Sequence, residues 1–346
     1  MSTVSLIIPN RNGRHFLRPC LESLRQQTRT PDEIIVVDNG STDGSQGFLS
    51  KQYPGVSVLE LGYNAGFSVA MNRGVEAASG VYVALLNNDT ECEPQWLENL
   101  AETLDQHPDI GFCAAKMLHF DRKELIDTAG DMFSTGGFFF KRGGFQFDEG
   151  QYDQPERVFG ACAGAAIYRK SLFDDLGGFD EDFFIYQEDG DLSFRAQLAG
   201  FPCLFVPDAV VYHHVGGTSK LSSIESSRRL KRLEHRNLIF ILIKNLPGSL
   251  WLRYGLWIIL AYFLLFLMQI RKGYGIATLC GYLDALRGLS PMLGKRRDIQ
   301  ANRRVSPRYI DSIIDARWIF KLFEPYRRKR ILQKQGIEKR PGKDRC

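Results

Sequence analysis

A cluster of oxygen-bearing side chains follows an apolar run in the first third of the chain. Residues 81–86 are continuously apolar, which is typical of a central parallel strand covered on both faces, and Asn87, Asn88 and Asp89 come directly after them. Mg²⁺ and Mn²⁺ prefer a few oxygen ligands and take the others from water and substrate phosphates. Asp89 is therefore the candidate metal ligand, with the Asn87 amide beside it. The alternative is a polar turn that ends the strand.

Two earlier apolar runs end in polar residues as well. Residues 33–37 lead into Asp38 and Asn39, and residues 4–8 lead into Pro9, Asn10 and Asn12. Ligands of open parallel sheets bind at the carboxyl ends of the strands, so these residues are expected at one rim with Asp89. A carboxylate such as Asp38 accepts hydrogen bonds from a base N–H or from ribose hydroxyls. The same residues also fit a capped turn, and both roles are compatible.

A third polar group precedes a predicted helix over residues 67–78. Asn64 and Gly66 stand before it and Asn72 lies within it, and the free N–H groups at such a helix start favour phosphate. The pattern is neither the GxGxxG of dinucleotide-binding folds nor a Walker loop with GK[ST]. Kinase and NAD-dependent classes therefore lose their best support.

Three carboxylates in four residues follow an aromatic run at residues 183–186. They are Glu188, Asp189 and Asp191, ahead of a helix predicted at 192–199. Aromatic walls desolvate a carboxylate and raise its pKa, which makes it a better base toward a hydroxyl. Capping of the helix by acidic residues is the alternative. Arg195 is expected to pair with Asp191 at i,i+4 spacing.

Two histidines, His213 and His214, follow the last predicted strand. Adjacent side chains on a strand point to opposite faces, so only one of the two is expected to face the Asp89 site as a further metal ligand. A surface position is the alternative for such a residue.

The elements that must hold these residues alternate as in an α/β domain. The remaining predicted strands are 56–61, 110–115, 159–168, 202–206 and 209–212, and the remaining predicted helices are 15–26, 45–52, 94–107 and 170–176. Between 120 and 157 the pattern breaks into glycine, aromatic and charged residues, and we expect a flexible excursion or hairpin over the site. A doubly wound, mostly parallel sheet flanked by helices is the expected architecture.

Charge divides the chain into two parts with different partners. Residues 1–227 carry a balance of −15, whereas residues 228–346 carry +19. The seven cysteines are scattered without a CxxC pair, which suits a reducing cytosol better than a disulfide framework. The basic part surrounds an apolar stretch, so it indicates an anionic membrane surface and no nucleic acid.

The apolar stretch itself is short for a transmembrane helix. Residues 254–268 carry no charge, and fifteen helical residues span roughly 22 Å against a hydrocarbon core of roughly 30 Å. Residues 250–269 cross only if Arg253 snorkels. An in-plane or re-entrant helix is therefore preferred over a full span, with a buried core helix as the remaining possibility. The expected divisions are residues 1–221, a membrane-associated helical region at 222–325 and a disordered basic tail at 326–346.

The ordered set of motifs resembles the family 2 glycosyltransferases with a GT-A fold, and among them the bacterial rhamnosyltransferase-like branch. The resemblance covers residues 3–219. It depends on Ile7-Ile8-Pro9-Asn10-Arg11-Asn12, Val36-Val37-Asp38-Asn39-Gly40-Ser41-Thr42-Asp43, Asn64-Ala65-Gly66-Phe67 through Asn72-Arg73-Gly74, Leu86-Asn87-Asn88-Asp89, Gly177-Gly178-Phe179-Asp180 through Glu188-Asp189, and His214 before Gly216-Gly217-Thr218-Ser219.

The resemblance implies an inverting transfer of a sugar from a nucleotide donor to a hydroxyl. It implies a donor site of Pro9, Asn10, Asn12, Asp38, Asn39, Asn64, Gly66, Asn72 and Asn88. The metal-binding Asp-x-Asp reads here as Asn87-Asn88-Asp89, so Asp89 is left as the chief ligand of Mg²⁺ or Mn²⁺ and His214 gains importance. Asp189 is assigned as the general base, with Glu188 as its competitor.

The implied donor is a dTDP- or UDP-sugar, and the rhamnosyltransferase-like branch suggests rhamnose as the sugar. The implied acceptor is lipid-linked or a polysaccharide, at the cytoplasmic face of the inner membrane. Two other functions stay open. A sugar-nucleotide pyrophosphorylase shares the sheet topology, but it needs a glycine-rich basic loop that Gly13 and Arg14 alone do not form. A membrane-anchored binding module without activity is suggested by Asn87 in place of the first acid.

Overall fold

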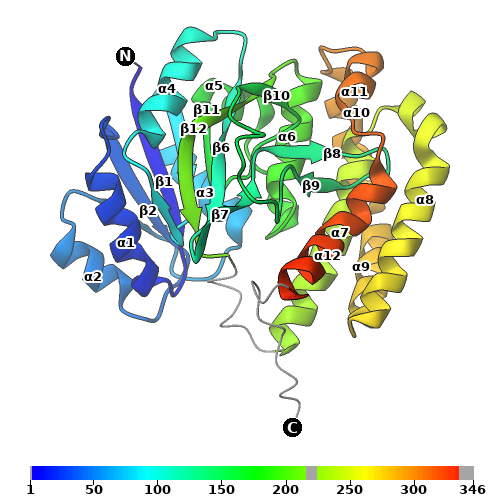
Figure 1. Cartoon of the computed structure of the whole chain (residues 1–346), viewed down its shortest axis with the longest axis horizontal. Helices are drawn as coiled ribbons and strands as arrows, with labels where there is room; N and C mark the ends of the chain where they lie inside the picture. The colour runs from blue at the N-terminus through cyan, green and yellow to red at the C-terminus, as the bar shows by residue number, and fades with distance from the viewer. Residues whose placement is uncertain (1, 216–223, 335–346) are drawn as a thin grey trace.

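The structure, a computed structural model, describes residues 2–215 and 224–334. Its N-terminal part is a mixed sheet flanked by helices, and its C-terminal part is a group of helices at one end of that sheet (Figure 1). The strands are β1 Val4–Asn10, β2 Glu33–Asp38, β3 Ser57–Glu60, β4 Tyr82–Leu86, β5 Thr90–Cys92, β6 Phe112–His119, β7 Arg122–Thr128, β8 Asp131–Phe133, β9 Phe139–Lys141, β10 Glu156–Val158, β11 Ala165–Arg169 and β12 Cys203–His213.

The main sheet has the order β10-β12-β6-β11-β4-β1-β2-β3. Neighbours β4, β1, β2 and β3 run parallel, β6 and β12 run parallel, and β11 lies antiparallel between β4 and β6. The helices of this part are α1 Arg14–Arg25, α2 Ser45–Gln52, α3 Phe67–Ala77, α4 Trp96–Gln106, α5 Lys170–Leu176 and α6 Glu188–Leu198, with a 3₁₀ turn η1 at Glu181–Phe183. The predicted α/β class is confirmed.

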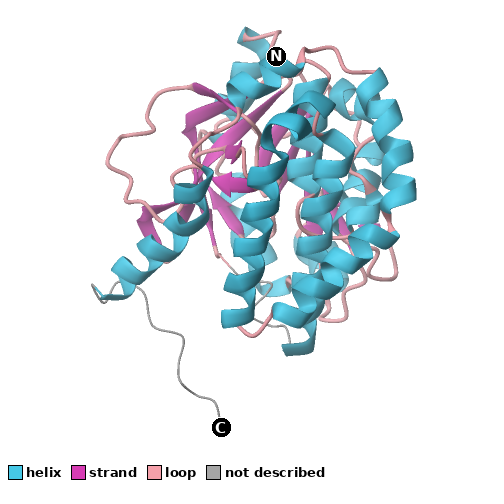
Figure 2. Cartoon of the chain, turned by 90° about the vertical axis from the view of Figure 1, so that its right-hand side faces the viewer, coloured by secondary structure: helices cyan, strands magenta, loops and turns pink. Residues whose placement is uncertain are grey.

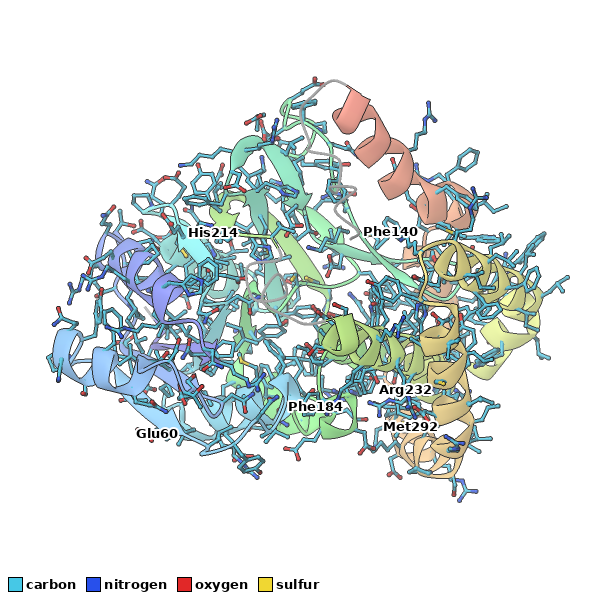
Figure 3. The ribbon with its side chains drawn as sticks, turned by 90° about the horizontal axis from the view of Figure 1, so that it is seen from below. Glu60, Phe140, Phe184, His214, Arg232 and Met292 are labelled. Carbon is cyan, nitrogen blue, oxygen red and sulfur yellow. The ribbon has the colours of Figure 1, made fainter. Side chains whose placement is uncertain are left out.

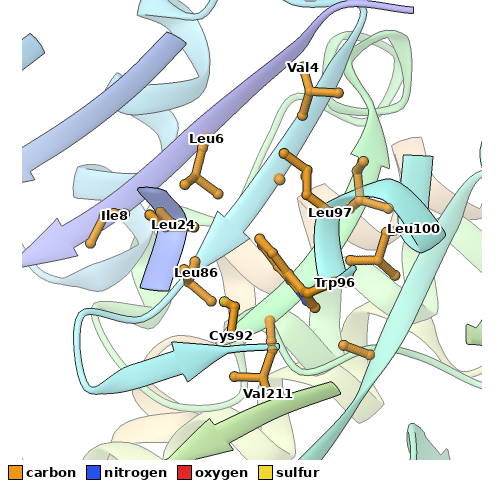
Figure 4. Packing of buried hydrophobic residues seen from close by; sticks show 14 of the residues in the cluster. Val4, Leu6, Ile8, Leu24, Leu86, Cys92, Trp96, Leu97, Leu100 and Val211 are labelled. Carbon is orange, nitrogen blue, oxygen red and sulfur yellow. The ribbon is translucent and has the colours of Figure 1, made fainter. Parts of the chain in front are cut away.

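Hydrophobic packing on both faces explains the continuous apolar strands. Every residue of β4 is buried. On β1, Leu6 and Ile8 pack into the cluster that contains Trp96 of α4, whereas Ile7 packs with Met71 of α3 on the other face. Figure 4 shows Trp96 among Leu86, Leu97 and Val211 in the first of these clusters. A strand covered on both sides has no polar face, so alternation is absent.

Three sequence expectations differ from the structure in this region. The strand predicted at 159–168 is confined to β11, because the small residues at 160–164 form a loop and turn that precede it. The strands predicted at 202–206 and 209–212 are one strand, β12, with a register shift between Val206 and Val210. Helix α6 begins at Glu188, before the predicted start at 192, so the acid pair lies on its first turn.

The excursion expected at 120–157 is a set of short strands. Strand β7 pairs with β6, β8 and β9 form a separate antiparallel hairpin, and β10 pairs with β12 at the sheet edge. The hairpin is fastened to the main body by a backbone bridge between Asp131 and Gly160. A hairpin was among the expectations, and this one brings charged residues to the site described below.

The C-terminal helices are α7 Ile224–Asn245, α8 Gly248–Arg271, α9 Gly275–Arg287, α10 Leu289–Ala301, α11 Pro307–Ile313 and α12 Trp318–Lys334. We call α7–α12 the helical extension; its helices lie side by side in Figure 2. Helix α12 continues past residue 325, where a disordered tail was predicted to begin, as far as Lys334. The predicted boundary at 221–222 and the motif Gly216-Gly217-Thr218-Ser219 lie outside the described residues.

One hydrophobic cluster joins the helical extension to the sheet domain. It contains Phe159 and Phe194 from the sheet side and Phe240, Leu250 and Ile310 from the extension. A hollow of about 650 Å³ lies along the same junction, lined by residues of α3, α5, α6, α7 and α10. The two parts therefore share a core.

Candidate functional site

A network of amides and one carboxylate forms the rim predicted at the ends of β1, β2 and β4. The parallel register places Asn10 beside Asp38. Asn10 Nδ2 donates to Asp38 Oδ2 at 3.1 Å, and Asn88 Nδ2 donates to Asn10 Oδ1 at 2.8 Å. Asp38 Oδ1 also accepts from the Ser41 backbone N–H and from Gln46. Because Asp38 is fully buried, it holds this rim together from within.

Other predicted donor-site residues organise the loops around the rim. Asn12 adopts a positive φ of 52°, and its Oδ1 accepts from the Thr42 N–H at 2.7 Å. Asn39 Nδ2 donates to the Gly66 carbonyl at 3.0 Å, and its Oδ1 accepts from the Ala65 N–H. Pro9 stands in β1, one residue before the rim. Asn64 is exposed, whereas Asn39 is buried and bonds the loop that carries Asn64.

The N–H groups at the start of α3, which were expected to favour phosphate, bond another part of the chain. The N–H groups of Phe67 and Ser68 donate to the carbonyl of Phe184, so the chain itself occupies the predicted phosphate position. A Cβ on Gly66 would meet the Phe184 ring and carbonyl, which explains the glycine there. Asn72 is also engaged, because its amide bonds both backbone groups of Phe179 at 2.8 and 2.9 Å. Gly66 and Asn72 thus both take part in contacts with the 179–184 segment.

Strand β5 decides which histidine faces Asp89. It pairs antiparallel with β12, which sets Thr90 opposite His213. His213 Nε2 lies 3.5 Å from Asp89 Oδ1, and both side chains are nearly buried. His214 Nε2 instead lies 3.3 Å from Glu91, and its ring stacks on Phe120 at 3.7 Å. One histidine does face Asp89, as expected of adjacent strand residues, but it is His213 and not His214.

The third member of the predicted metal triplet, Asn87, takes part in the backbone around Asp89. Its N–H donates to the Gly164 carbonyl, and its own carbonyl accepts from the Thr90 hydroxyl at 2.6 Å. Its side-chain amide covers Gly164, where a Cβ would stand 2.9 Å from Nδ2. In the described residues, no group of three or more His, Cys, Asp or Glu side chains could hold a metal ion. Asp89 and His213 nevertheless provide a carboxylate and an imidazole at the end of β4 that could share one.

A chain of ionic contacts leads away from His213. His213 Nδ1 lies 2.9 Å from Asp127 Oδ2, and Lys141 Nζ bonds both oxygens of Asp127 at 2.7 and 2.8 Å. Burial opposes protonation of the imidazole, but its bonds to Asp127 and Asp89 prevail and raise the pKa of His213 to about 9. Burial also opposes the charge of Asp127, yet Lys141 and His213 hold its pKa well below the ordinary range.

The predicted acid pair is on the first turn of α6. Glu188 is buried, its Oε2 has no hydrogen-bond partner in the described structure, and burial with the nearby Asp189 charge raises its pKa well above the ordinary value. Asp189 is only partly buried; Oδ1 accepts from the Gly190 N–H at 2.8 Å. Burial raises the pKa of Asp189 as well, while the Gly190 and Ala163 N–H groups and the Lys141 charge oppose that rise.

The β8–β9 hairpin joins the two halves of the site. Burial and the charge of Asp189 raise the pKa of Asp131, on β8, to about 7. Lys141, on β9, bonds Asp127 and interacts electrostatically with Asp131 and Asp189. The contacts therefore run without a break from Asp89 through His213 and Asp127 to Lys141, and the Lys141 charge reaches Asp189.

Sequence reasoning did not identify Asp127, Asp131 or Lys141, and of the two adjacent histidines it preferred His214 to His213. Asp127, Asp131 and Lys141 belong to the excursion, where glycine and aromatic residues hide any strand period. Only the pairing of β5 with β12, of β7 with β6 and of β8 with β9 brings these residues to the rim. The predicted pair of Arg195 and Asp191 is confirmed, with Nε 2.8 Å from Oδ2.

Phe184 lies toward the helical extension and His214 toward the sheet domain (Figure 3).

Comparisons with known proteins identify the family and the fold. The family model described as Glycosyl transferase family 2 matches residues 5–177. The chain is 30% identical over 223 residues to the N-acetylglucosaminyl-diphospho-decaprenol L-rhamnosyltransferase of Mycobacterium tuberculosis, a match that covers 58% of this chain and 72% of that protein. It is 27% identical over 234 residues to the O-antigen biosynthesis protein RfbC of Myxococcus xanthus, with 64% and 18% covered.

A similar solved structure is the crystal structure of GalNAc-T7 with UDP, GalNAc and Mn²⁺. The TM-score is 0.64 at 17% sequence identity, and the match covers 94% of this chain and 58% of the other. At this identity the likeness concerns the fold, and the predicted GT-A architecture is confirmed.

Proposed function

The chain belongs to glycosyl transferase family 2 and is a glycosyltransferase, and we propose that it transfers a sugar with inversion from a nucleoside diphosphate sugar to an acceptor hydroxyl. We propose a lipid-linked or polysaccharide acceptor at the cytoplasmic face of a membrane. The observation that best supports this function is the series of contacts from Asp89 through His213 and Asp127 to Lys141. One end of the series is the candidate diphosphate site at Asp89, and at the other end the Lys141 charge acts on the candidate base, Asp189.

The proposed reaction is a single displacement. Asp189 accepts the proton of the acceptor hydroxyl while that oxygen forms a bond to the anomeric carbon. The bond from this carbon to the diphosphate oxygen breaks at the same time, and the nucleoside diphosphate leaves with the electron pair. Asp189 suits this role because burial raises its pKa while its side chain stays partly exposed. Glu188 is buried, and its pKa is also raised by burial and by the nearby Asp189 charge, so it is less accessible to an acceptor.

The residues at the rim fit a divalent cation, Mg²⁺ or Mn²⁺, that takes its other ligands from the diphosphate and water. Asp89 and His213 would hold it, His213 after its imidazole has released a proton, because their ligating atoms are 3.5 Å apart and both side chains are nearly buried. When bound, such an ion neutralises charge on the departing diphosphate. Asn87 and His214, predicted as further ligands, are the weaker candidates, since each is engaged elsewhere.

The donor and acceptor are inferred from the relatives' names. The Mycobacterium tuberculosis relative is named for transfer of L-rhamnose to a decaprenol-linked diphosphate sugar, and the RfbC relative for O-antigen biosynthesis. We therefore propose a dTDP- or UDP-sugar donor, with dTDP-rhamnose as the first to be tested. A lipid-linked acceptor also agrees with the surface of the helical extension.

An outward apolar stripe runs the length of α8. Its exposed residues follow the spacing of one helix face: Leu252, Leu256, Ile259, Phe263, Leu267 and Ile270. The opposite face, with Ile258, Ala261 and Tyr262, is buried against the protein. A second exposed stripe on α9 has the same spacing: Ile276, Leu279, Leu283 and Leu286. We call the two stripes together the apolar face.

The apolar face supports a helix that lies in the membrane plane. In the described residues, α8 is the one helix long and apolar enough to cross a bilayer, and 22% of its most apolar stretch is buried. Because protein covers one side of α8, a crossing would carry folded chain into the hydrocarbon. Exposed Arg271, Lys272 and Arg287 stand at the helix ends and favour anionic headgroups. The cysteines that the structure describes are free, as expected of a cytoplasmic side.

A donor panel tests the enzymatic part of the proposal. Full-length protein with Mg²⁺ or Mn²⁺ should release nucleoside diphosphate from one of dTDP-rhamnose, UDP-sugars or GDP-sugars, and the release should increase with a polyprenyl-diphosphate-sugar acceptor. NMR of the product should show the inverted anomer. Donor binding without transfer or hydrolysis across the panel would favour a binding module.

Vesicle sedimentation tests the membrane part. Wild-type protein should pellet with vesicles that contain phosphatidylglycerol, and the double variant Leu256→Glu with Phe263→Glu should remain in the supernatant. Val81→Glu is a matched control, since Val81 is an equally exposed apolar residue on the sheet domain. A double variant that pellets as well as wild type would contradict the assignment of the apolar face.

A further inference from the structure

The segment that leads into the acid pair has an unusual backbone. Phe184, Tyr186 and Gln187 have positive φ values of 63°, 69° and 71°, although none is glycine. Such conformations are disfavoured for residues with a Cβ, and they persist where the surroundings hold them. Gln187 is the residue immediately before α6, so the path of residues 184–187 sets where Glu188 and Asp189 point.

A single side chain of the helical extension binds this segment. Asn237, on α7, is fully buried, and its Nδ2 lies within hydrogen-bonding distance of three backbone carbonyls, those of Phe183 at 2.9 Å, Ile185 at 3.1 Å and Tyr186 at 2.8 Å, so that one of its two N–H groups is shared. Carbonyls that normally alternate in direction converge here on one amide. The convergence accounts for the positive φ values on either side of Ile185.

The neighbouring Arg236 fixes the orientation of that amide. Its Nε and one terminal nitrogen donate to Asn237 Oδ1 at 3.0 and 2.8 Å, so the Asn237 oxygen cannot exchange places with its nitrogen without losing these bonds. The same guanidinium donates to the carbonyl of Asp182. Two successive residues of α7 thus bind the backbone just ahead of the acid pair.

The sheet domain holds the opposite side of the segment. The Phe184 carbonyl accepts from the N–H groups of Phe67 and Ser68 at the start of α3, and Gly66 packs closely on the Phe184 ring. The segment is therefore gripped between α3, next to the donor rim, and α7 of the helical extension.

We propose that Asn237 is a positioning residue for the reaction, through which the helical extension determines the position and orientation of the Asp189 side chain. This inference rests on the proposed function, in which Asp189 accepts the acceptor proton. Asn237 does not touch the reacting atoms; it fixes the backbone that carries the base. A base displaced by about 1 Å can cost a reaction on the order of 10²-fold in rate.

The sharpest variant is Asn237→Asp, which keeps the shape of the side chain and the contact with Arg236 but removes both N–H donors. We expect kcat to fall 10- to 100-fold while the KM for the nucleotide sugar changes less than threefold, because the donor rim is untouched. Asn237→Gln keeps the donors on a longer stem and should restore part of kcat. The acid limb of the pH profile should also move, since the surroundings of Asp189 change.

Asn245→Ala is the matched control. Asn245 is fully buried on the same helix, and its amide bonds Asp191 on α6 at 2.8 Å rather than the 184–187 segment. A kcat loss in Asn237→Asp no larger than that of Asn245→Ala, at similar loss of thermal stability, would overturn the proposal. If Asn237→Asp does not fold, Arg236→Met removes the orienting bonds from a less buried position and should show a smaller loss of the same kind.

Hydrogen exchange separates this inference from the proposed function. Backbone amides of residues 184–190 should exchange faster in Asn237→Asp than in wild type, whatever substrate the protein uses, whereas Asn245→Ala should leave them unchanged. Unchanged exchange there would refute the positioning role. Full activity in Asp189→Asn with altered exchange in Asn237→Asp would refute only the choice of base.

Discussion

Replacing Lys244 should destabilise the protein more than replacing any exposed lysine of the helical extension. The side chain of Lys244 is 1% exposed and its ammonium bridges two buried carboxylates, Asp180 and Asp191. Removal of one member of a buried ion pair leaves uncompensated charge and costs about 3–5 kcal/mol. Asp180 would keep Lys295 and Asp191 would keep Arg195, so we expect Lys244→Met to cost about 3 kcal/mol, the lower end of that range.

Lys295→Met is the comparison that isolates burial. Lys295 bonds the same Asp180, but its side chain is 38% exposed, so solvent screens the pair and the cost should be about 0–1 kcal/mol. Urea unfolding of both variants in the same detergent, followed by tryptophan fluorescence, gives the two midpoints. Equal losses in Lys244→Met and Lys295→Met would refute the reasoning, because burial would then have no influence.

The effect should also depend on pH with a defined sign. The lysine and arginine partners hold the pKa of Asp180 and of Asp191 below the ordinary value of 3.8, against the opposing effect of burial. A depressed pKa in the folded state contributes stability above the unfolded pKa, and this contribution is lost as the pH falls through the folded value. The difference between wild type and Lys244→Met should therefore stay constant from pH 6 to about 4 and shrink as the pH is lowered further.

Three further predictions concern the site. Asp189→Asn should lower kcat about 10²–10⁴-fold with donor binding by calorimetry unchanged, and normal turnover would transfer the role of base to the adjacent glutamate. Turnover should fall as the pH drops through the raised pKa of Asp189. Because the Lys141 charge lowers that pKa, Lys141→Met should move the acid limb of the kcat profile to higher pH. An acid limb at the wild-type pH in this variant would contradict the prediction. Asp89→Ala and His213→Ala should raise the Mn²⁺ concentration needed for donor binding in a titration, whereas His214→Ala should not; identical behaviour of the two histidine variants would argue against the geometry.

The sheet and its rim could be predicted because local signals determine them. Continuous apolar runs identify β1, β2 and β4 wherever both faces are covered. The rule that ligands bind at the carboxyl ends of parallel strands then groups Asn10, Asp38 and Asp89 without further information. The predicted Arg195–Asp191 pair depended only on helical spacing.

The remainder depends on pairings that carry no local signal. Strand β5 has three residues, too few for a period, yet its register decides that His213 faces Asp89. Lys141 and His213 meet Asp127 across separations of 14 and 86 residues. At the start of α3, the N–H groups of Phe67 and Ser68 bond the Phe184 carbonyl, more than a hundred residues away, and no local signal predicts that contact.

The shared core between the two parts has a consequence for the choice of acceptor. Because Phe159 and Phe194 pack in one cluster with Phe240 and Leu250, the reaction centre cannot swing freely above the apolar face. With the apolar face against a bilayer, as proposed above, this rigid link would set one height between the bilayer surface and Asp189. Lipid-anchored acceptors whose reactive hydroxyl stands at that height would then be preferred.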